Sequence, residues 1–550
     1  MITAQRFKNA VLSGANNLLR HKDEIDKLNV FPVPDGDTGT NMSMTLSAGV
    51  AALEEMELDR HSRIDEVSEK LAAAVLRGAR GNSGVIVSLF FQGFAEGCKG
   101  KKLLSVSEFA TAMAKSVEMA YKAVLKPTEG TILTVSRSAA EAVGEARQQG
   151  GKEEEMLTAA FVQGEKTLSK TPEMLPLLKK AGVVDAGGQG YISFFEGVMH
   201  YLRTGKIIER EAEINLEESV ADPVPLSEDE ITFTYCTEFL IAKNEEGDVD
   251  ALRDYLASIG DSLICVEVSG IVKVHVHTDH PGLAMEEALK VGSFEKIKIE
   301  NMRLQFRARQ KRGEKAEQKE EESDAPVAIE TAVGFVAVCA GEGLQQTFED
   351  LGCHKVIRGG QTMNPSAEDI LKACLASPAE NVIVLPNNSN IVMAARQAAG
   401  ITTERKIHVI PTKTIPQGVT AALNFDPDGD IDTNLTTMTE ALATVRSGQV
   451  TRAARDSDFE GRSIKKDEVL ALSEGKLTGV YQTYREAVLA LLDELVEEES
   501  FMITLFCGED ADQNEAEEIE RIATEKFPQA DFSRVNGGQP VYPYLISVEK

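Results

Sequence analysis

Two strongly charged stretches divide the chain into three segments, and each segment has a different hydrophobic periodicity. The first stretch covers residues 206–230 and the second covers residues 307–324. Neither stretch can bury enough apolar surface to offset the conformational entropy that folding removes, so we expect both to be connectors. A chain of 550 residues is also longer than a single hydrophobic core usually supports. The sequence therefore predicts a multidomain protein.

The first segment, residues 1–204, has helical periodicity almost throughout. Apolar residues recur three and four positions apart, as at Phe7, Val11 and Leu18, and the alternation typical of strands is nearly absent. Three glycine-rich breaks interrupt the helices, at residues 34–39, 78–84 and 182–190. Each break leads directly into another apolar helical stretch. We predict an all-α domain whose chemistry lies at these breaks.

The middle segment, residues 226–306, changes to the pattern of a small α+β domain. Its expected elements are strand 231–242, helix 249–259, strands 263–268 and 271–278 joined by a tight turn, a helix from Pro281, and strand 294–299. This βαββαβ order predicts a ferredoxin-like sandwich. We expect residues 307–325 after it to form a flexible linker.

The last segment, residues 326–550, has the pattern of an α/β domain. Four strand-like runs alternate with helical stretches, at residues 333–340, 355–358, 381–385 and 407–411. The alternation predicts a parallel sheet with helices on its faces. We expect helix-rich sequence from residue 432 to residue 498, followed by strands at 501–507 and 544–548.

Charge and cysteine content restrict the function classes. The chain has 58 Lys and Arg against 88 Asp and Glu, a net charge of −30, so a nucleic-acid backbone would be repelled by most of the surface. No apolar run is long enough for a membrane span, and the N-terminal residues show no export signal. The seven cysteines form no CxxC pair. We expect a cytoplasmic protein that binds no nucleic acid.

The strongest local motif is NVFPVPDGDTGTNM at residues 29–42. Asp35 and Asp37 are two positions apart on extended backbone, so their carboxylates project to the same side and can hold hard cations. A site with so few protein ligands suits Mg²⁺, because this ion keeps bound waters and takes phosphate oxygens as ligands. The spacing of the residues excludes an EF-hand. Thr38 or Thr40 can cap the following helix. A simple turn with an N-cap is the alternative interpretation.

The second break, RGARGNSG at residues 77–84, leads into an apolar helix. Its glycines allow close backbone approach, the helix start offers free N–H groups, and Asn82 and Ser83 add polar side chains, which together suit a phosphate. It is not a Walker A loop because no Gly-Lys-Ser/Thr ending is present. The third break has the same features, glycines that lead into an apolar helix, and Asp185 is its only charged residue. An ordinary turn between helices is the alternative for each.

Three of the eight histidines fall in the run HVHTDH at residues 275–280. On a strand, His275 and His277 share one face, and Cys236 lies on the first expected strand of the same sandwich. Two imidazoles and a thiolate suit Zn²⁺. The alternative is a structural or interface role.

These motifs together resemble a known family. NVFPVPDGDTGTNM, RGARGNSGVI, KPTEGTILTV and GVVDAGGQGY occur in the order found in the nucleotide-binding DhaL-type domain of dihydroxyacetone kinases, in the form present in the FakA family of fatty acid kinases. The resemblance continues through VKVHVHTDHPG, VIRGGQTMNPS and LPNNSNI, so it spans essentially the whole chain. The last segment resembles the lipid-binding DegV fold, in which residues 387–390 would begin a helix after a strand. We interpret this region as a docking platform for a partner.

The resemblance implies an all-α helical barrel with ATP at one end and phosphates bridged to the aspartate loop by Mg²⁺. Asp35 and Asp37 would hold the metal, with Asn29 near the position where the sugar-kinase relatives have a third aspartate. Arg77 and Arg80 would act in catalysis by stabilising the migrating phosphoryl group, unless they are ordinary solvated arginines. The implied nucleotide-binding residues are Thr38, Asn41, Asn82, Ser83, Gly84, Thr131, Asp185, Gly187 and Gly188.

The function implied by the resemblance is an ATP-dependent fatty acid kinase. A separate DegV-type fatty-acid-binding protein would present the acyl carboxylate, and the acyl phosphate produced would feed phospholipid synthesis. We also expect a homodimer. Two alternatives remain: a regulatory scaffold that binds nucleotide without turnover, and a dihydroxyacetone-type kinase that receives its substrate from another subunit. The presence of both Asp35 and Asp37 argues against the scaffold.

Overall fold

The computed structural model describes residues 1–29, 36–124, 127–210, 232–244, 247–268, 270–303, 327–360, 363–453, 457–459 and 462–550. Asp35, the expected linker 307–325 and most of the expected connector 206–230 lie outside these residues. The chain divides into two compact units. One contains residues 1–209 and 325–550, and the other contains residues 210–324.

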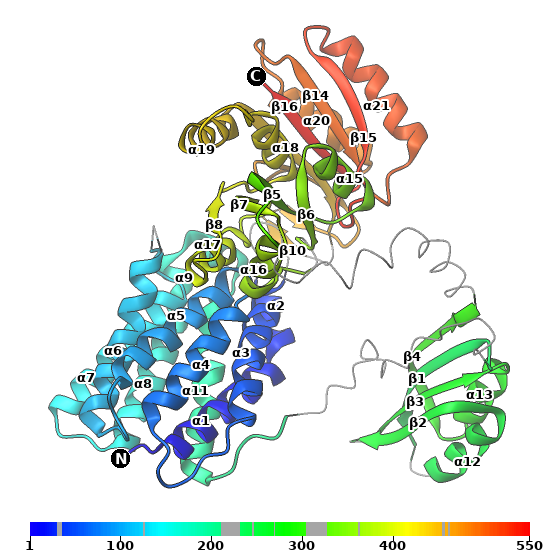
Figure 1. Cartoon of the computed structure of the whole chain (residues 1–550). Coiled ribbons are helices and arrows are strands. Elements are labelled where there is room, and N and C mark those ends of the chain that lie inside the picture. The colour runs from blue at the N-terminus through cyan, green and yellow to red at the C-terminus, as the bar shows by residue number, and fades with distance from the viewer. Residues whose placement is uncertain are drawn as a thin grey trace. The chain divides into compact units, whose positions relative to one another are not determined.

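Residues 1–204 form a helical bundle, which confirms the predicted all-α fold (Figure 1). Its helices are α1 (Ala4–Arg20), α2 (Lys22–Leu28), α3 (Thr38–Glu54), α4 (Ile64–Arg77), α5 (Gly81–Cys98), α6 (Val106–Ala123), α7 (Ile132–Gln148), α8 (Glu153–Leu168), α9 (Thr171–Met174), α10 (Pro176–Ala181) and α11 (Ala186–Thr204). Leucine, valine and phenylalanine side chains at the expected helical spacing fill one continuous core.

Local sequence explains where the helices of this bundle begin and end. Ser105 and Glu108 form a capping box at the start of α6. The backbone turns at Gly182 and Gly205 with φ of 67° and 71°, a left-handed conformation that glycine adopts without strain, and these residues end α10 and α11. The helix ends are therefore sharp, and the polar breaks lie at fixed places on the bundle.

The middle unit has the predicted βαββαβ order. Its elements are β1 (Tyr235–Lys243), α12 (Val249–Ile259), β2 (Gly260–Val268), β3 (Ile271–Thr278), α13 (Pro281–Ala288) and β4 (Gly292–Asn301). The antiparallel sheet has the order β2-β3-β1-β4, as in a ferredoxin-like sandwich. Its core lies between the sheet and the two helices.

The C-terminal region (residues 327–550) starts with the predicted parallel sheet. Its strands, in the order β6-β5-β7-β8, are β5 (Thr331–Cys339), β6 (Cys353–Arg358), β7 (Ala379–Leu385) and β8 (Lys406–Val409). The helices that follow these strands are α15 (Glu342–Asp350), α16 (Ala367–Leu375), α17 (Val392–Ile401), α18 (Ile415–Leu423) and α19 (Ile431–Glu440).

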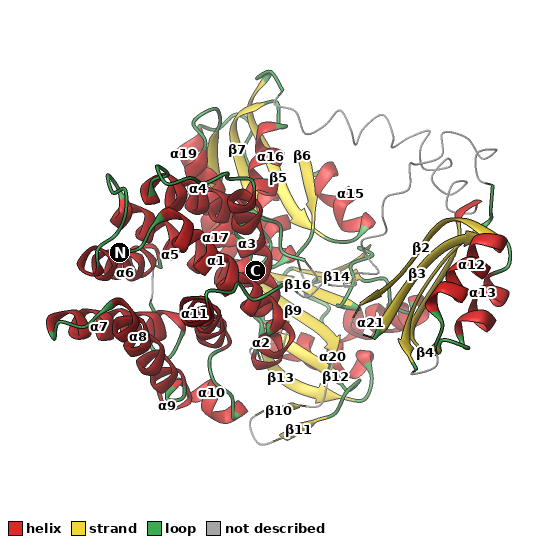
Figure 2. Cartoon of the chain, turned by 90° about the horizontal axis from the view of Figure 1, so that it is seen from below, coloured by secondary structure: helices red, strands yellow, loops and turns green. Residues whose placement is uncertain are grey.

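A second sheet corrects the expectation of helix-rich sequence over residues 432–498. It has the order β13-β12-β9-β16-β14-β15, and Figure 2 shows its strands beside α20 and α21. The elements are β9 (Val445–Arg452), β12 (Val469–Ser473), β13 (Lys476–Tyr481), α20 (Tyr484–Leu495), β14 (Met502–Cys507), α21 (Gln513–Lys526), β15 (Asp531–Asn536) and β16 (Tyr544–Glu549), with a small hairpin of β10 (Ser457–Phe459) and β11 (Arg462–Ile464). The strand β12 is buried on both faces, so its apolar run lacks the alternation that marks a half-buried strand.

The helical bundle and the C-terminal region belong to the same compact unit and share apolar packing. Ala79 and Val85 of the bundle lie in one core cluster with Val336 and Ile391 of the C-terminal region. The backbone N–H of Ala367 donates to the carbonyl of Ala79 at 3.1 Å. Within the described part of the chain, every helix is too short or too polar to cross a membrane.

Candidate active site

The starts of α3 and α5 lie against each other at one end of the bundle. A Cβ added to Gly84 would overlap the hydroxyl oxygen of Thr45, and a Cβ on Gly81 would lie 2.5 Å from Nδ2 of Asn41. Only glycine permits this approach, and the φ of 57° at Gly81 adds a second reason for glycine there. The N-terminal turns of both helices therefore lie side by side.

The starts of α7 and α11 meet at the same end of the bundle. A Cβ on Gly187 would lie 3.2 Å from Cβ of Ile132, the first residue of α7. A Cβ on Gly190 of α11 would lie 2.6 Å from Sδ of Met42 on α3. Four helix N-termini thus converge, and each presents the positive end of its helix dipole. Such an arrangement is well suited to binding phosphate groups.

Asp37 lies at this convergence, immediately before α3. Its side chain does not cap α3 and is instead hydrogen-bonded by the side chains of Asn41 and Asn364. Asn364 belongs to the C-terminal region and donates to Oδ2 of Asp37 at 2.7 Å. Burial raises the pKa of Asp37 above 3.8, the two amides oppose this shift, and the negative charge of Asp26 adds to it. A carboxylate in this setting would be stabilised by a cation.

Asp26 is a residue of this site that sequence reasoning missed. Its Oδ1 accepts from the backbone N–H groups of Gly39 at 2.6 Å and Thr40 at 3.1 Å, and its Oδ2 accepts from the Thr40 hydroxyl at 2.7 Å. Asp26 therefore caps α3 from the neighbouring helix α2. Burial raises its pKa as well. Sequence patterns for helix caps involve residues only a few positions apart, so they could not identify Asp26 as a cap of α3.

The two predicted arginines have different surroundings. Arg80 donates to the backbone carbonyl of Asn364 at 2.8 Å and pairs with Asp369 at 3.2 Å. Arg77 is exposed at the end of α4 and lines a cavity of about 490 Å³ between α4, α5 and α17. Both groups lie close to the second glycine-rich break, and only Arg80 contacts the loop that reaches Asp37.

The polar side chains of the second break also contact the C-terminal region. The amide of Asn82 donates to Oδ1 of Asn390 at 3.1 Å, and Gln397 donates to the hydroxyl of Ser88 further along α5. Asn390 lies within residues 387–390, a loop of the C-terminal region in which we expect the docking platform. This loop faces the helical bundle of the same chain.

Asp185 and Thr131 hold the starts of α11 and α7. The carboxylate of Asp185 accepts from the backbone N–H of Gly188 at 2.7 Å and from that of Ile132, and burial raises its pKa to about 6. The hydroxyl of Thr131 donates to the carbonyl of Thr128 at 2.7 Å. The structure thus gives both residues local structural contacts, and their predicted contact with a nucleotide stays a prediction.

The other predicted residues group around the same end. Thr38 and Asn41 are buried in the first turns of α3, and Asn29 ends α2 on the chain segment that leads to the aspartate loop. Gly84, Gly187 and Gly188 lie in the first turns of α5 and α11. Asp37, Asn29 and these predicted nucleotide residues therefore lie at one end of the bundle, while Asp35 lies outside the described residues.

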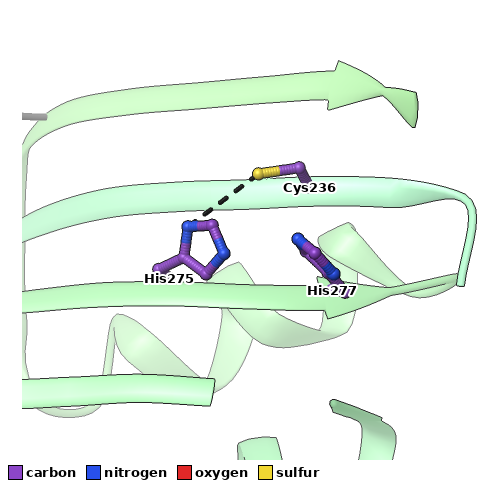
Figure 3. Close-up of side chains that lie close together, drawn as sticks. All are labelled: Cys236, His275 and His277. Atoms are coloured by element: carbon purple, nitrogen blue, oxygen red, sulfur yellow. Dashed lines mark hydrogen bonds between the residues drawn. The ribbon is translucent and has the colours of Figure 1, made fainter. Parts of the chain in front are cut away.

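A second cluster lies in the middle unit and joins Cys236, His275 and His277. Their ligand atoms all lie within 4.8 Å of one another, and Figure 3 shows the three side chains together on neighbouring strands. The antiparallel register of β1 and β3 places Cys236 opposite His277. Sγ of Cys236 lies 3.9 Å from Nδ1 of His275, and the two imidazole centres are 5.0 Å apart.

Two carboxylates that the sequence analysis did not select support this cluster. Oε1 of Glu238 lies 2.8 Å from Nδ1 of His275, and both residues are buried. Oδ1 of Asp261 lies 3.7 Å from Nδ1 of His277. A carboxylate against an imidazole nitrogen orients the ring and is the usual support of a metal-binding histidine. The sequence did contain a signal for Glu238: it lies two positions after Cys236, so both side chains are on the same face of the strand.

An apolar cavity lies inside the helical bundle. Its volume is about 120 Å³, and aromatic side chains including Phe90, Phe94 and Tyr191 line it. Sites for drug-sized ligands usually have volumes of roughly 300–1,000 Å³. The cavity is too small to hold a long acyl chain in this arrangement.

Comparison with known proteins matches each of the three parts of the chain to a domain family. The DAK2 domain matches residues 32–200, the FakA-like (fatty acid kinase) middle domain matches residues 232–309, and the FakA-like C-terminal domain matches residues 334–549. Protein YloV of Bacillus subtilis is 39% identical over 557 residues, covering 100% of this chain and 99% of the relative. The chain belongs to the FakA-like family.

As a member of this family with a DAK2 domain, the chain is a kinase-family protein. Among solved structures, the C. freundii dihydroxyacetone kinase in complex with AMP-PNP and Mg²⁺ is 17% identical with a TM-score of 0.29, covering 36% of this chain and 34% of the other. The Streptococcus pneumoniae fatty acid kinase B3 protein loaded with linoleic acid is 14% identical with a TM-score of 0.28, covering 40% and 99%. At these TM-scores the likenesses carry no weight for function.

The domain assignments place the two side-chain clusters of this FakA-like protein in different parts of the family architecture. Asp37 and the four helix starts lie within the DAK2 match, and Asn364 lies within the C-terminal match. The cysteine–histidine cluster lies within the middle-domain match. The first cluster is the candidate nucleotide site.

Proposed function

We propose that the protein is an ATP-dependent kinase that phosphorylates the carboxylate of a fatty acid, which a separate lipid-binding protein of the DegV type presents. A carboxylate oxygen of the acceptor attacks the γ-phosphorus of ATP, the bond to the bridging oxygen breaks, and acyl phosphate and ADP result. The acyl phosphate would serve phospholipid synthesis. Membership of the FakA-like family supports the substrate class.

The observation that carries the kinase proposal is the convergence of four helix starts beside Asp37. Phosphoryl transfer depends on charge neutralisation and alignment more than on covalent chemistry by the protein. The helix starts would supply positive dipole ends and N–H donors for phosphate oxygens, and Arg80 lies beside the loop that reaches Asp37. Mg²⁺ would supply charge neutralisation between the phosphates and the carboxylates.

The residues present fit Mg²⁺. Asp37 is a partly buried carboxylate whose described hydrogen-bond partners are neutral amides, and its raised pKa reflects the burial of a negative charge. Asp37 would hold the metal together with Asp35 from the same loop, and Asn29 lies next to that loop. Oxygen ligands of this kind are those that Mg²⁺ prefers.

The carrier-bound acceptor is supported by the small cavity of the helical bundle. At about 120 Å³ this cavity is smaller than a usual ligand site, which is consistent with an acyl chain that a carrier encloses. A carrier would present only the carboxylate to the γ-phosphate. We place the docking platform for it in residues 326–550.

One assay separates this function from the alternatives. ADP release and acyl phosphate would be measured with Mg²⁺ and ATP, in the presence of a fatty-acid-loaded carrier, an empty carrier, or dihydroxyacetone. We expect turnover with the loaded carrier only. Turnover with dihydroxyacetone would support the sugar-kinase alternative, and nucleotide binding without turnover under all conditions would support the scaffold.

We propose further that Cys236, His275 and His277 hold a zinc ion. A thiolate and two imidazoles leave one coordination position open, and Glu238 against His275 provides the supporting carboxylate. The residues therefore fit a Zn²⁺ site with one open position.

Exposed Ile297 and Ile299 on the edge strand β4 supply an apolar surface for the proposed homodimer.

A further inference from the structure

Asn364 reaches the candidate metal site from the C-terminal region. It lies in the short segment before α16, and only 4% of its surface is exposed. Its Nδ2 donates to Oδ2 of Asp37 at 2.7 Å and lies 3.5 Å from Oδ1 of Asn41. An amide of the C-terminal region is thus buried against the carboxylate that the kinase proposal assigns to Mg²⁺.

Contacts on either side hold Asn364 in this position. Arg80 donates to the backbone carbonyl of Asn364 at 2.8 Å, and the same guanidinium pairs with Asp369 at 3.2 Å. The N–H of Ala367 donates to the carbonyl of Ala79 at 3.1 Å. Residues 79–80 of the bundle therefore fix the backbone of residues 364–369 at several points.

The other polar atom of the Asn364 side chain has no hydrogen-bond partner among the described residues. Oδ1 is buried, although a buried acceptor without a donor costs about 1–3 kcal/mol. Buried unsatisfied atoms are uncommon in folded proteins and each requires an explanation. An acceptor beside a carboxylate matches a hydrated cation, because Mg²⁺ binds the carboxylate and keeps waters that donate hydrogen bonds.

We propose that Asn364 is a positioning residue that completes the kinase metal site from the C-terminal region. Its N–H group holds Oδ2 of Asp37 and so leaves Oδ1 of Asp37 to face the metal, and its carbonyl oxygen accepts from metal-bound water. Carboxylates that ligate metals are normally oriented by hydrogen bonds of this kind. The inference rests on the proposed binding of Mg²⁺ with nucleotide at Asp37.

A consequence is that Mg²⁺-nucleotide binding and contact between the two regions favour each other. Coupling of two binding events is reciprocal, so the docked C-terminal region strengthens Mg²⁺-nucleotide binding, and the bound nucleotide strengthens docking. The isolated bundle would bind Mg²⁺-nucleotide more weakly than the full chain. Asn82 with Asn390 and Ser88 with Gln397 belong to the same contact surface and are not hydrogen-bond partners of Asp37.

The test is nucleotide binding to the full chain without any lipid carrier. Calorimetric titration with ADP would be carried out with Mg²⁺ and with a chelator, for the wild type, Asn364→Ala and Asn364→Ser. We expect both variants to bind ADP about 10–100-fold more weakly with Mg²⁺, the range found when supporting residues of metal ligands are removed. Their affinity without Mg²⁺ should equal that of the wild type. Circular dichroism verifies that the variants fold.

Gln397→Ala is the matched control. It removes one hydrogen bond from the same contact surface without touching Asp37, so its Mg²⁺-dependent affinity should stay close to that of the wild type. Hydrogen exchange gives a second measure: Mg²⁺ and ADP should slow exchange in α16 of the wild type and much less in Asn364→Ala.

Three outcomes would overturn the inference. Unchanged Mg²⁺-dependent affinity in both Asn364 variants would reduce the contact to packing. Tighter binding in these variants would show that the amide competes with the metal. An equal loss in Gln397→Ala would assign the effect to docking alone. If the wild type itself bound no nucleotide with Mg²⁺, the kinase proposal would fail instead, so the two failures are distinguishable.

Discussion

The side chains of Asp37 and Asn364 are 327 residues apart in sequence and joined by a hydrogen bond of 2.7 Å. One belongs to the helical bundle and the other to the α/β C-terminal region. The contact is reinforced by Arg80, which binds the backbone of Asn364 and the side chain of Asp369. The C-terminal region therefore contacts the end of the bundle where the four helix starts converge, in addition to the partner-docking role proposed for it.

Replacing Asp37 by alanine should abolish acyl phosphate formation and leave the bundle folded. Asp37 does not cap α3 with its side chain, so its loss should remove the proposed metal ligand without unfolding the helix. We expect the rate to fall at least about a hundredfold, because a bound cation contributes several kcal/mol of transition-state stabilisation. Glu57→Ala, an exposed acidic position, is the matched control. A variant within about tenfold of the wild-type rate would refute the metal assignment.

Replacing Asp185 by asparagine should stabilise the nucleotide-free protein at neutral pH. Burial raises the pKa of Asp185 from 3.8 to about 6, so the folded chain binds this proton more tightly than the unfolded chain. Stability of the wild type therefore decreases as pH rises between these two values. Asparagine keeps an oxygen for the N–H of Gly188 and avoids this loss.

Thermal unfolding of the full chain measures this effect. The midpoint of Asp185→Asn should exceed that of the wild type at neutral pH, and the difference should shrink as pH falls toward 3.8. Asp59→Asn is the control, because the pKa of Asp59 is shifted in the opposite direction. Backbone N–H donors lower the pKa of Asp59, so its replacement should not stabilise the protein at neutral pH. A midpoint difference for Asp185→Asn that does not vary with pH would contradict the prediction.

Limited proteolysis should cut first between residues 307 and 324. The composition of this stretch provides no apolar core to protect the backbone. Mass spectrometry of the earliest fragments identifies the site. Early cleavage within the helical bundle, with residues 307–324 intact, would be inconsistent with the predicted domain boundaries.

Residues 1–204 alone should bind ATP with Mg²⁺ and fail to phosphorylate a carrier-bound fatty acid. The helix starts and Asp37 lie on this segment, which has its own core, while the proposed carrier-docking platform lies after residue 325. Transfer requires the carboxylate within reach of the γ-phosphate, and loss of positioning removes most of the rate. Binding should be weaker than in the full chain because Asn364 is absent.

The comparison is acyl phosphate yield from segment 1–204, from the full chain, and from a chain lacking residues 326–550, all with the same loaded carrier. A high carrier concentration should restore part of the activity. Full activity of segment 1–204 would exclude the docking role of the C-terminal region and leave it a regulatory one.

Protein purified without chelator should contain zinc, as measured by elemental analysis. Serine at Cys236 or alanine at His275 should remove the metal, because each eliminates one of the three proposed ligands. Glu238→Gln should weaken zinc binding about 10–100-fold, since the carboxylate orients His275. Absence of metal, together with normal activity of His275→Ala, would assign the cluster to packing.

Local sequence patterns were sufficient for several parts of this protein. Helical periodicity with glycine-rich breaks predicted the bundle and the positions of its helix starts, because caps and breaks depend on residues a few positions apart. Alternation on short strands predicted the βαββαβ order and the shared face of His275 and His277. The parallel strands β5–β8 were also predicted. The strands β9, β12 and β13 were not predicted, and of these β12 is buried on both faces and so lacks alternation.

Only the tertiary structure decided which distant residues meet. Asp26 caps α3 from a different helix, and Glu238 and Asp261 reach the two histidines from other strands. Asn364 reaches Asp37 from another region of the chain. These contacts join groups that are distant in sequence, because hydrogen bonds and ion pairs form according to distance in the folded chain. The sequence determined the elements and the chemistry available on them, and packing determined which of those groups share a site.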